Sequence, residues 1–495
     1  MIISSLTGIK TVSIFIEVLN PLQGKGPNYY PLKAKIKNIK LWIIAIGCLF
    51  IILPVAWLLL VRLEGQPPTL ELDPVSPYIG KSQELTLAVS DAQSGLRRLW
   101  VGLLKDGKEV VLQDTDFQSA GFLGGGSLKE TSIKIPIAPQ KLGFSDGEAI
   151  LRMVVHDYSW RDWWIGNKTY LEKTVVIDTQ PPEIEVLSRA HNINQGGAGL
   201  VIFRTSENCS QSGVQVGDRF YPGHGGAFAD PLVYIAYIAL GYQQGPDTDI
   251  RVRAVDPAGN STESSFYYHI RRKTFRKDKI NISDGFLKRK IPEFSGQIPL
   301  GASKSPLDKF LEINRDVRRA NYMKIAAACQ NPNPKRHWRG RFLRLPKSAT
   351  RARFADHRTY FYKGNPIDQQ VHLGIDLASV ANSPVPAGND GVVALASASD
   401  GLGIYGKTVI LDHGYGLFSM YSHLSQIAVK VGDHVSKGDK LGRTGSTGMA
   451  GGDHLHFSML INDTFVNPVE WWDIKWIQNN VTSKIEWAQS LTSKE

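Results

Sequence analysis

The chain has 495 residues, more than one ordinary domain holds, so it should contain about three or four domains. Apolar residues make up 42% and charged residues 21%, which argues against a largely disordered chain. A net charge of +11 suits an anionic polymer or surface, but without a nucleic-acid-binding motif we expect no nucleic-acid partner. Cys48, Cys209 and Cys329 are too few for a disulfide framework, and without a CxxC pair they argue against a cysteine zinc site.

An apolar run, residues 41–61, predicts a single transmembrane helix near the N-terminus. It contains 21 residues without a charge, which is long enough to cross a hydrocarbon core of roughly 30 Å. A cleaved signal peptide is the alternative, but the run starts late, is too long and lacks a small-residue cleavage site after it. Lysines before the run outnumber the single Arg62 after it, so we expect residues 1–40 in the cytoplasm and everything after 62 outside.

Short alternating apolar runs predict two β-sandwich-like domains after the helix, over residues 66–180 and 181–272. In the first of them, Asp106-Gly107 between two apolar runs predicts a tight hairpin turn. Similar strand endings, each followed by turn residues, suggest two copies of one fold that resembles bacterial extracellular immunoglobulin-like modules. Such modules are more often spacers or binding units than enzymes, so envelope proteins are candidate partners for them.

A basic segment, residues 273–340, follows and is interpreted as a solvated linker that contains one helix. Ser305-Pro306 is a typical helix start, and the apolar spacing after it predicts a helix over 306–329 that docks on a neighbouring domain. Short strands and glycine turns return over 341–475, which predicts a mostly antiparallel β domain. The tail, residues 476–495, has the spacing of a short amphipathic helix.

The β domain at 341–475 contains three clusters of metal-capable side chains. His454 and His456 are two residues apart, so they share one face of an extended strand. His372 and Asp376 can also share a face, with Gly374 between them, and His423 stands in a Tyr-Ser-His sequence. Two histidines and one carboxylate are a sufficient set for a catalytic zinc that keeps one coordination position open for water.

Four sequence elements in this domain carry a family resemblance. They are HLGIDLA, VILDHGYGLFSMYSHL, VKVGDHVSKGDKLGRTGSTG and DHLHFSM, in that order. Together they resemble the M23 peptidases, also called the LytM or lysostaphin-like family. The resemblance covers roughly residues 350–472. It implies a small antiparallel β fold, a bound Zn²⁺, an envelope location and the stem peptides of bacterial peptidoglycan as the substrate.

Carried over position by position, the resemblance assigns His372, Asp376 and His456 as zinc ligands and His423 and His454 as the catalytic pair. One imidazole would accept the proton of the attacking water, because its pKa lies near 6.5. Which of the two is the base stays open. A tyrosine upstream of the HxxxD motif can stabilise the oxyanion in this family, and Tyr360 and Tyr362 are the candidates.

The resulting prediction is a zinc endopeptidase that hydrolyses peptidoglycan cross-links, held by residues 41–61 on the outer, periplasmic face of the bacterial inner membrane. The alternative is a non-catalytic M23 domain that regulates or scaffolds other envelope hydrolases. Members of that kind lack one or more ligands, whereas this chain has all of them. A second alternative, dinucleotide binding at Gly401–Gly406, is excluded because a β-branched strand follows the glycines.

The loop before His454 departs from the family. Its family wording is GxTGxSTGPHLH, but here Ala450-Gly451 and Asp453 replace the usual Ser-Thr and Pro. Losing a proline and gaining a glycine loosens a turn, so the sequence leaves the cross-link that is cleaved unassigned. A single-span envelope protein without a glycine-bridge-binding module favours direct D-Ala to diamino acid cross-links over glycine bridges.

Overall fold

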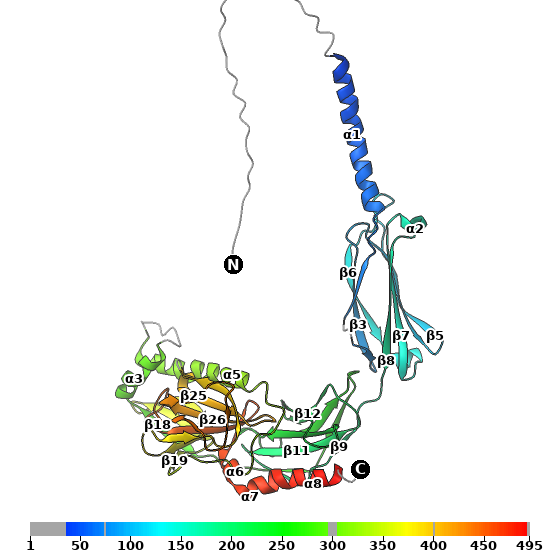
Figure 1. Cartoon of the computed structure of the whole chain (residues 1–495). Helices are drawn as coiled ribbons and strands as arrows, with labels where there is room; N and C mark the ends of the chain where they lie inside the picture. The colour runs from blue at the N-terminus through cyan, green and yellow to red at the C-terminus, as the bar shows by residue number, and fades with distance from the viewer. Residues whose placement is uncertain (1–35, 74–75, 296–303, 399–400, 493–495) are drawn as a thin grey trace, which may run out of the picture.

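A computed structural model describes residues 36–73, 76–295, 304–398 and 401–492, and it is mainly β, as predicted. The helix α1 (Ile36–Arg62) extends away from the folded body (Figure 1). Within it, Ile39–Arg62 is long and apolar enough to cross a membrane, and its side chains are not buried against the protein. The predicted span 41–61 therefore lies in one exposed helix. Of the predicted N-terminal segment 1–40, residues 1–35 lie outside the described residues.

The first β domain is a sandwich of two antiparallel sheets. The smaller sheet has the order β1 (Thr69–Asp73), β3 (Gln83–Ser90) and β6 (Glu130–Ile137). The larger has the order β2 (Tyr78–Ile79), β8 (Lys168–Ile177), β7 (Gly147–Asp157), β4 (Leu96–Lys105) and β5 (Lys108–Asp116), with β2 parallel to β8. Alternate residues of both sheets bury one common core. The predicted hairpin is confirmed: Asp106 and Gly107 join β4 to β5 with φ of 51° and 78°.

The second β domain is built from three small sheets. Their strand orders are β14 (Val233–Ala239), β11 (Ala198–Thr205), β9 (Ile184–Val186); β13 (Arg219–Pro222), β12 (Gln211–Val216), β15 (Ile250–Val255), β16 (Ser261–Ser265); and β10 (His191–Asn194), β17 (Tyr268–Arg271). The last pair is parallel. Strand β11 is buried along nearly its whole length, which shows that something covers both of its faces.

The C-terminal β domain is organised on one large antiparallel sheet. Its order is β19 (Ala349–Ala352), β22 (Ile375–Ala378), β30 (Leu455–Ile461), β26 (Leu417–Leu424), β25 (Lys407–Asp412), β24 (Gly391–Ser397), β28 (His434–Val435), with β31 (Thr464–Val466) on β30. A smaller sheet has the order β23 (Pro384–Pro386), β29 (Lys440–Arg443), β27 (Gln426–Ile427). Strand β26 is fully buried, so the centre of the large sheet is covered on both faces.

The segment 273–340 is not the solvated linker that the sequence suggested. Strand β18 (Lys277–Ile282) pairs in parallel with β20 (Asp356–Tyr362), which pairs with β21 (Asn365–His372). Two helical pieces follow, α3 (Asp284–Lys290) and a run formed by α4 (Pro306–Glu312), a π-helical turn at Ile313–Val317 and α5 (Arg318–Ala328). The alternating apolar residues of β18 are Ile280 and Ile282, and lysines and aspartate beside them hid this pattern in the sequence.

The second β domain and the peptidase domain share one continuous hydrophobic core. Tyr237 of β14 packs against Trp338 and Trp471 of the C-terminal part, with ring centroids 6.4 and 6.1 Å away. The C-terminal helices α6 (Pro468–Trp472), α7 (Ile474–Ile477) and α8 (Ser483–Thr492) run along this junction (Figure 1). The predicted tail therefore packs on the second β domain. With the shared core, this contact attaches the second β domain to the C-terminal domain more firmly than a spacer module would be attached.

Two buried ionisable groups join the domains at this junction. The Glu470 carboxylate accepts hydrogen bonds from Asn194 Nδ2 (2.7 Å) and from the Ala198 amide (2.8 Å). The Lys484 ammonium donates to the Leu200 carbonyl at 2.9 Å. Burial raises the pKa of Glu470 to about 7 and lowers the pKa of Lys484 to about 8.

We expect Glu470→Ala to lower the unfolding temperature of the chain, because it leaves the Asn194 amide and the Ala198 N–H unpaired in a buried place. Each such loss costs about 1–3 kcal/mol. Since the folded pKa of Glu470 lies above its ordinary value of 4.5, its contribution to stability is present below pH 4.5 and is lost as pH rises through 7. Thermal unfolding from pH 4.5 to 8 checks this, with the exposed Glu486→Ala on α8 as the control. An equal pH dependence in parent and Glu470→Ala would contradict it.

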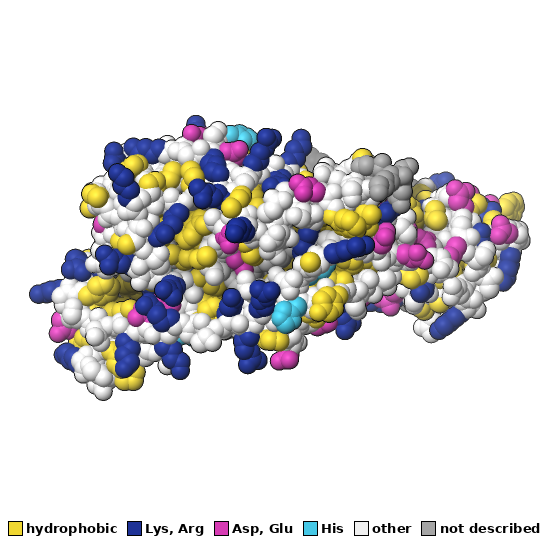
Figure 2. Space-filling model, turned by 90° about the horizontal axis from the view of Figure 1, so that it is seen from below, with side chains coloured by type: hydrophobic (Ala, Val, Ile, Leu, Met, Phe, Trp, Pro, Cys, Tyr) yellow, Lys and Arg dark blue, Asp and Glu magenta, His cyan; other side chains and the backbone are white. Residues whose placement is uncertain are grey.

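The positive side chains are dispersed on the face of the molecule that Figure 2 shows. Figure 2 shows Lys and Arg side chains scattered over one face among neutral and apolar ones, without one continuous basic patch. A dispersed charge of this kind keeps a protein soluble but does not outline a groove for a polyanion.

Candidate metal centre

Three strands bring the predicted zinc ligands together. Asp376 in β22 lies directly opposite His456 in β30 in the antiparallel register. His372 ends β21 and is four residues before Asp376. Side chains of directly opposed residues lie on the same face of a sheet, which is why a carboxylate and an imidazole from distant parts of the sequence meet here. The ligand atoms of the three residues lie within 4.8 Å of one another.

The hydrogen bonds fix which ring nitrogens face the centre. His372 Nδ1 lies 2.9 Å from the Arg353 carbonyl, which can only accept, so Nδ1 carries the proton. His372 Nε2 is then unprotonated and lies 2.9 Å from both Asp376 Oδ1 and His456 Nδ1. Imidazole nitrogens and a carboxylate oxygen are donors that zinc prefers. The three donor atoms converge as such a site requires, so the residues present fit a zinc ion.

A serine and a glycine hold His456 in place. Ser458 Oγ donates to the Leu373 carbonyl (2.8 Å), so the contact with His456 Nε2 (3.0 Å) is donated by the ring. This bond leaves His456 Nδ1 unprotonated toward the centre. A Cβ atom at Gly374 would lie 2.5 Å from His456 Nε2 and from Ser458 Oγ, so this position needs glycine. Partners of this kind orient metal-binding imidazoles.

Asp376 divides its two oxygens between the centre and an arginine. Oδ2 accepts a hydrogen bond from Arg358 at 3.0 Å, while Oδ1 lies 3.0 Å from His456 Nδ1. Burial alone would raise the pKa of Asp376, but the adjacent His372, His454 and His456 side chains hold it well below the ordinary value. Burial also lowers the pKa of His456 to about 4. Asp376 is therefore ionised and His456 neutral, the states in which both groups bind a metal.

The structure places His423 and His454 beside the three predicted ligands. Their ring centroids are 4.8 Å apart, and His454 Nε2 lies 3.5 Å from Asp376 Oδ1. His423 Nδ1 bonds to the Thr447 carbonyl and His454 Nδ1 to the Gly452 carbonyl, both at 2.8 Å. Because a carbonyl only accepts, each ring carries a proton on Nδ1, so in the neutral ring Nε2 is the free base. Each neutral ring can thus act as a general base through Nε2.

Their pKa values shift in opposite directions. Burial and the neighbouring histidines lower the pKa of His423 well below its ordinary value. Burial also acts to lower the pKa of His454, but the hydrogen bond and charge of Asp376 outweigh it and raise that pKa.

A local irregularity of β26 aims His423 at the centre. Ser422 is the residue opposite His456, so in a regular strand the next side chain would point to the other face of the sheet. The pairing of β25 with β26 shifts register at this point, and His423 has a φ of 61°. Bulges and left-handed residues re-aim side chains at active sites. The sequence spacing gives no sign of this turn.

The five residues line one cavity of about 320 Å³. The segment before the predicted domain supplies much of its wall: Ile280 and Ile282 of β18, Phe286 of α3, Phe310 of α4 and Arg318 of α5. Sequence reasoning missed these residues, because they precede the recognisable motifs. It also missed Arg358 and Tyr405, which line the same cavity. The ring of Tyr405 lies 5.4 Å from the ring of His456, measured between centroids.

Of the other residues singled out in the sequence, some line the cavity and one does not. Tyr360 lines the cavity and packs on Phe310, with ring centroids 5.8 Å apart. Tyr362 instead donates its hydroxyl to Asp284 and is not among the described residues that line the cavity. The altered loop does border the cavity, through Met449, Ala450 and Gly451.

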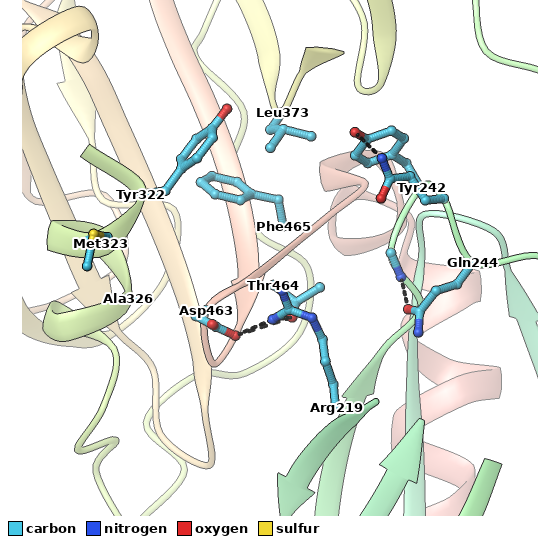
Figure 3. A pocket seen from close by; sticks show the side chains of 12 residues that line it. Arg219, Tyr242, Gln244, Tyr322, Met323, Ala326, Leu373, Asp463, Thr464 and Phe465 are labelled. Atoms are coloured by element: carbon cyan, nitrogen blue, oxygen red, sulfur yellow. Dashed lines mark hydrogen bonds and ion pairs between the residues drawn. The ribbon is translucent and has the colours of Figure 1, made fainter. Parts of the chain in front are cut away.

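A second cavity, of about 390 Å³, lies at the junction of the domains (Figure 3). Tyr322 of α5 and Phe465 of β31 lie side by side on one wall, with ring centroids 6.1 Å apart. Arg219 crosses from the second β domain to Asp463, with an N–O distance of 2.8 Å. Leu373 lines this second cavity, and the residue before it, His372, lines the first. The two cavities therefore flank the end of β21.

Comparisons with known proteins agree with this geometry. Residues 370–468 match the model of Peptidase family M23. The chain is 38% identical over 110 residues to the DD-carboxypeptidase/endopeptidase Mpg of Neisseria meningitidis, covering 22% of this chain and 25% of the relative. It is 35% identical over 108 residues to the peptidoglycan DD-endopeptidase ShyA of Vibrio cholerae, covering 21% and 24%.

One solved structure is also similar over part of the chain. The catalytic domain of the antimicrobial peptidase lysostaphin from Staphylococcus simulans is 29% identical and aligns over 26% of this chain and 94% of its own, with a TM-score of 0.23. The matched part of this chain spans about a quarter of the length of the curated relatives. The C-terminal part of the chain, residues 370–468, is a domain of peptidase family M23.

Proposed function

We propose that the chain is a zinc-dependent endopeptidase that hydrolyses peptide cross-links of bacterial peptidoglycan. The observation that supports it most is the convergence of His372 Nε2, His456 Nδ1 and Asp376 Oδ1 in a cavity that two further unprotonated imidazoles also line. The names of the relatives, a peptidoglycan DD-endopeptidase among them, support the same class of substrate.

His372, Asp376 and His456 would hold the metal, each oriented by a partner on its far side: the Arg353 carbonyl, Arg358 and Ser458, respectively. When bound, zinc polarises a carbonyl and makes water a nucleophile near neutral pH. Each of the three side chains would thus be held in one orientation by a hydrogen bond on the side that faces away from the metal.

His423 and His454 move protons in this proposal. One of them accepts the proton of the attacking water on Nε2 and returns it to the leaving amine. The other, once protonated on Nε2, donates a hydrogen bond to the oxygen on which negative charge develops. Both rings lie close to the proposed metal ligands, and the ring centroids of His423 and His456 are 5.8 Å apart.

The helix α1 supports a location in the inner membrane with the peptidase domain on its periplasmic side. In that position the first β domain separates the metal centre from the bilayer, as in Figure 1, where α1 and the M23 domain lie at opposite ends. The chain would reach cross-links in the wall above the membrane while it stays tethered.

Incubation of isolated sacculi with the full chain in detergent tests the proposal. We expect cross-linked dimeric muropeptides to decrease and monomers to increase, and a zinc chelator to stop both changes. Unchanged sacculi, together with a stimulation of a separate wall hydrolase, would instead identify a regulatory M23 domain and overturn the proposed activity.

A further inference from the structure

The side chain of Arg318 stands at the metal centre without a counter-charge. It belongs to the first turn of α5, after the π-helical turn at Ile313–Val317, and lines the same cavity as His372, Asp376 and His456. This part of the chain precedes the residues that match the M23 family, 370–468. Arg318 therefore lines the cavity from outside the part of the chain that matches the family.

The hydrogen bonds of Arg318 go to neutral acceptors. Nε donates to the Asn314 carbonyl at 3.1 Å, and Nη2 to Asn314 Oδ1 at 2.7 Å. Asn314 in turn donates to Asp368 at 2.7 Å, so its orientation is fixed. Within the described parts of the chain, no carboxylate lies within ion-pair distance of Arg318, whereas Arg315 pairs with Asp368 and Arg358 with Asp376.

The surroundings of Arg318 favour an anion beside it. The side chain is half-buried, and Tyr360, Tyr322 and Tyr405 lie near the guanidinium. A half-buried charge loses part of its hydration, which a carboxylate ligand would replace. Among the described residues lining the cavity, Asp376 is the only carboxylate, and Arg358 already neutralises it. Among the described residues lining the cavity, no carboxylate is therefore left to balance Arg318.

We propose that Arg318 binds a carboxylate of the substrate on the amine side of the scissile amide; this rests on the proposed endopeptidase function. A guanidinium presents two parallel N–H donors that match a carboxylate. Arg318 and Tyr405 line the same cavity, and the ring centroid of Tyr405 lies 5.4 Å from that of His456. A carboxylate that binds there is close to the bond being hydrolysed.

This placement selects among the cross-links of peptidoglycan. In a direct cross-link to diaminopimelate, the carbon that bears the acylated amine also bears a free carboxylate. A lysine side chain has no carboxylate on that carbon, and a glycine bridge places an ordinary amide there. Arg318 therefore assigns diaminopimelate cross-links as the substrate class and a free carboxylate as the recognised group.

Two purified cross-linked dimers test this assignment. They are identical except that one carries a free carboxylate and the other a carboxamide on the carbon next to the scissile amide. We expect the full chain in detergent to cleave the carboxylate dimer with a kcat/KM about 10- to 100-fold higher, the worth of a charge-assisted hydrogen bond. Arg318→Gln should remove this preference by slowing only the carboxylate dimer.

Arg319→Gln is the matched control, because that side chain is 76% exposed and lies one position further along the helix. Arg318→Lys keeps the positive charge but lacks the two parallel N–H donors of arginine, so it should retain part of the preference for the carboxylate dimer. This variant serves as a control for a folding defect in Arg318→Gln. Equal slowing of both dimers by Arg318→Gln would show a merely structural residue and overturn the inference. Failure of the parent chain to cleave either dimer would overturn the proposed function itself.

A second, independent observation concerns the surface where α1 meets the first β domain. Five large apolar side chains are exposed there: Phe122 (67%), Leu123 (62%), Trp163 (90%), Trp164 (52%) and Ile165 (51%). We call these five residues the aromatic tip. They come from two loops and meet, since the ring centroids of Phe122 and Trp164 are 5.4 Å apart.

The aromatic tip is attached to the end of α1. The Trp160 amide donates to the Arg62 carbonyl at 2.6 Å, and Arg161 Nε to the Leu63 carbonyl at 3.0 Å. Arg62 lies over the Trp160 ring at 5.1 Å, and Glu64 accepts from the Ser94 amide at 2.7 Å. Figure 1 shows the short helix α2 (Arg161–Trp164), which carries two of these tryptophans, directly beside the end of α1.

We infer that the aromatic tip inserts into the interfacial layer of the bilayer that α1 crosses. Tryptophan favours the level of the lipid headgroups, where its ring is apolar and its N–H is wet. The tip lies where α1 leaves the hydrocarbon, so it continues the surface that lipid already covers. Two contacts, the helix and the tip, then hold the first β domain upright on the membrane.

Fluorescence of a labelled full chain in lipid vesicles tests this inference. A chain with Cys48, Cys209 and Cys329 replaced by alanine receives one cysteine, Trp163→Cys, labelled with an environment-sensitive dye. We expect blue-shifted emission and quenching by a headgroup-attached quencher. The control is Tyr267→Cys, at a position that is 85% exposed in the second β domain, where no quenching is expected. Emission at 163 like that of the dye in water, with the chain still inserted in the vesicles, would overturn the inference.

Discussion

Replacing His456 by alanine is expected to abolish zinc binding and to reduce cross-link hydrolysis by about a thousandfold or more. His456 Nδ1 is one of three converging donor atoms, and its removal leaves only His372 and Asp376, too few for a stable zinc site. Hydrolysis of an amide without the Lewis acid loses most of its rate enhancement. Metal analysis after dialysis and the rate of dimer cleavage measure both consequences on the same sample.

The histidine at 434 offers the control for this experiment. His434 is exposed in the same domain, and His434→Ala should keep one zinc per chain and the full rate. A His456→Ala chain that retains stoichiometric zinc would contradict the assigned ligands, even if its activity were lost.

Replacing His454 or His423 by alanine is expected to slow hydrolysis by about 10²- to 10⁴-fold while zinc stays bound, the range of general acid–base catalysis. Nε2 of each neutral ring is free to accept a proton. A backbone carbonyl, rather than a metal ligand, holds each ring in place through Nδ1. The loss should appear in kcat, since neither ring is needed to hold the metal. Steady-state kinetics with a defined dimer measure it.

Comparing the double variant with the two single variants gives a further test. Because the two groups act together in the same chemical step, the double variant should lose little more than the worse single variant. Loss of zinc in either single variant would contradict the division of roles, and rates near those of the parent would contradict a role in catalysis.

The sequence predicted that His372, Asp376 and His456 converge because they stand in short motifs with local geometry. HLGID places His372 and Asp376 around a glycine, and the structure shows why that glycine is required beside His456. Alternation along a strand placed His454 and His456 together. The exception is His423, whose orientation depends on a bulge and a left-handed φ that no spacing rule reveals.

The surroundings of the centre were less predictable, because they arise from packing between distant segments. Lys277–Ile282 is rich in charged residues, yet it adds a strand beside β20 and lines the cavity with Ile280 and Ile282. A sequence reading judges such a segment by its own composition. The partner strand that covers its apolar side lies about 80 residues further on, as the pairing of Lys277 with His357 shows.

The same limit applies to the second β domain and the C-terminal tail. Apolar spacing indicated strands and a helix but not what their apolar faces contact. The structure shows that they contact each other, with buried Glu470 and Lys484 at the junction. Arg318 was likewise invisible, since a helical arginine in a sequence gives no sign that it points into a cavity without a partner.

The most direct test of the central claim is mass spectrometry of one defined cross-linked dimer after incubation with the metal-stripped chain, with and without one equivalent of zinc. The account predicts that zinc restores cleavage of the cross-linking amide, giving two monomers whose summed mass is that of the dimer plus one water. An intact dimer in the presence of bound zinc would contradict it.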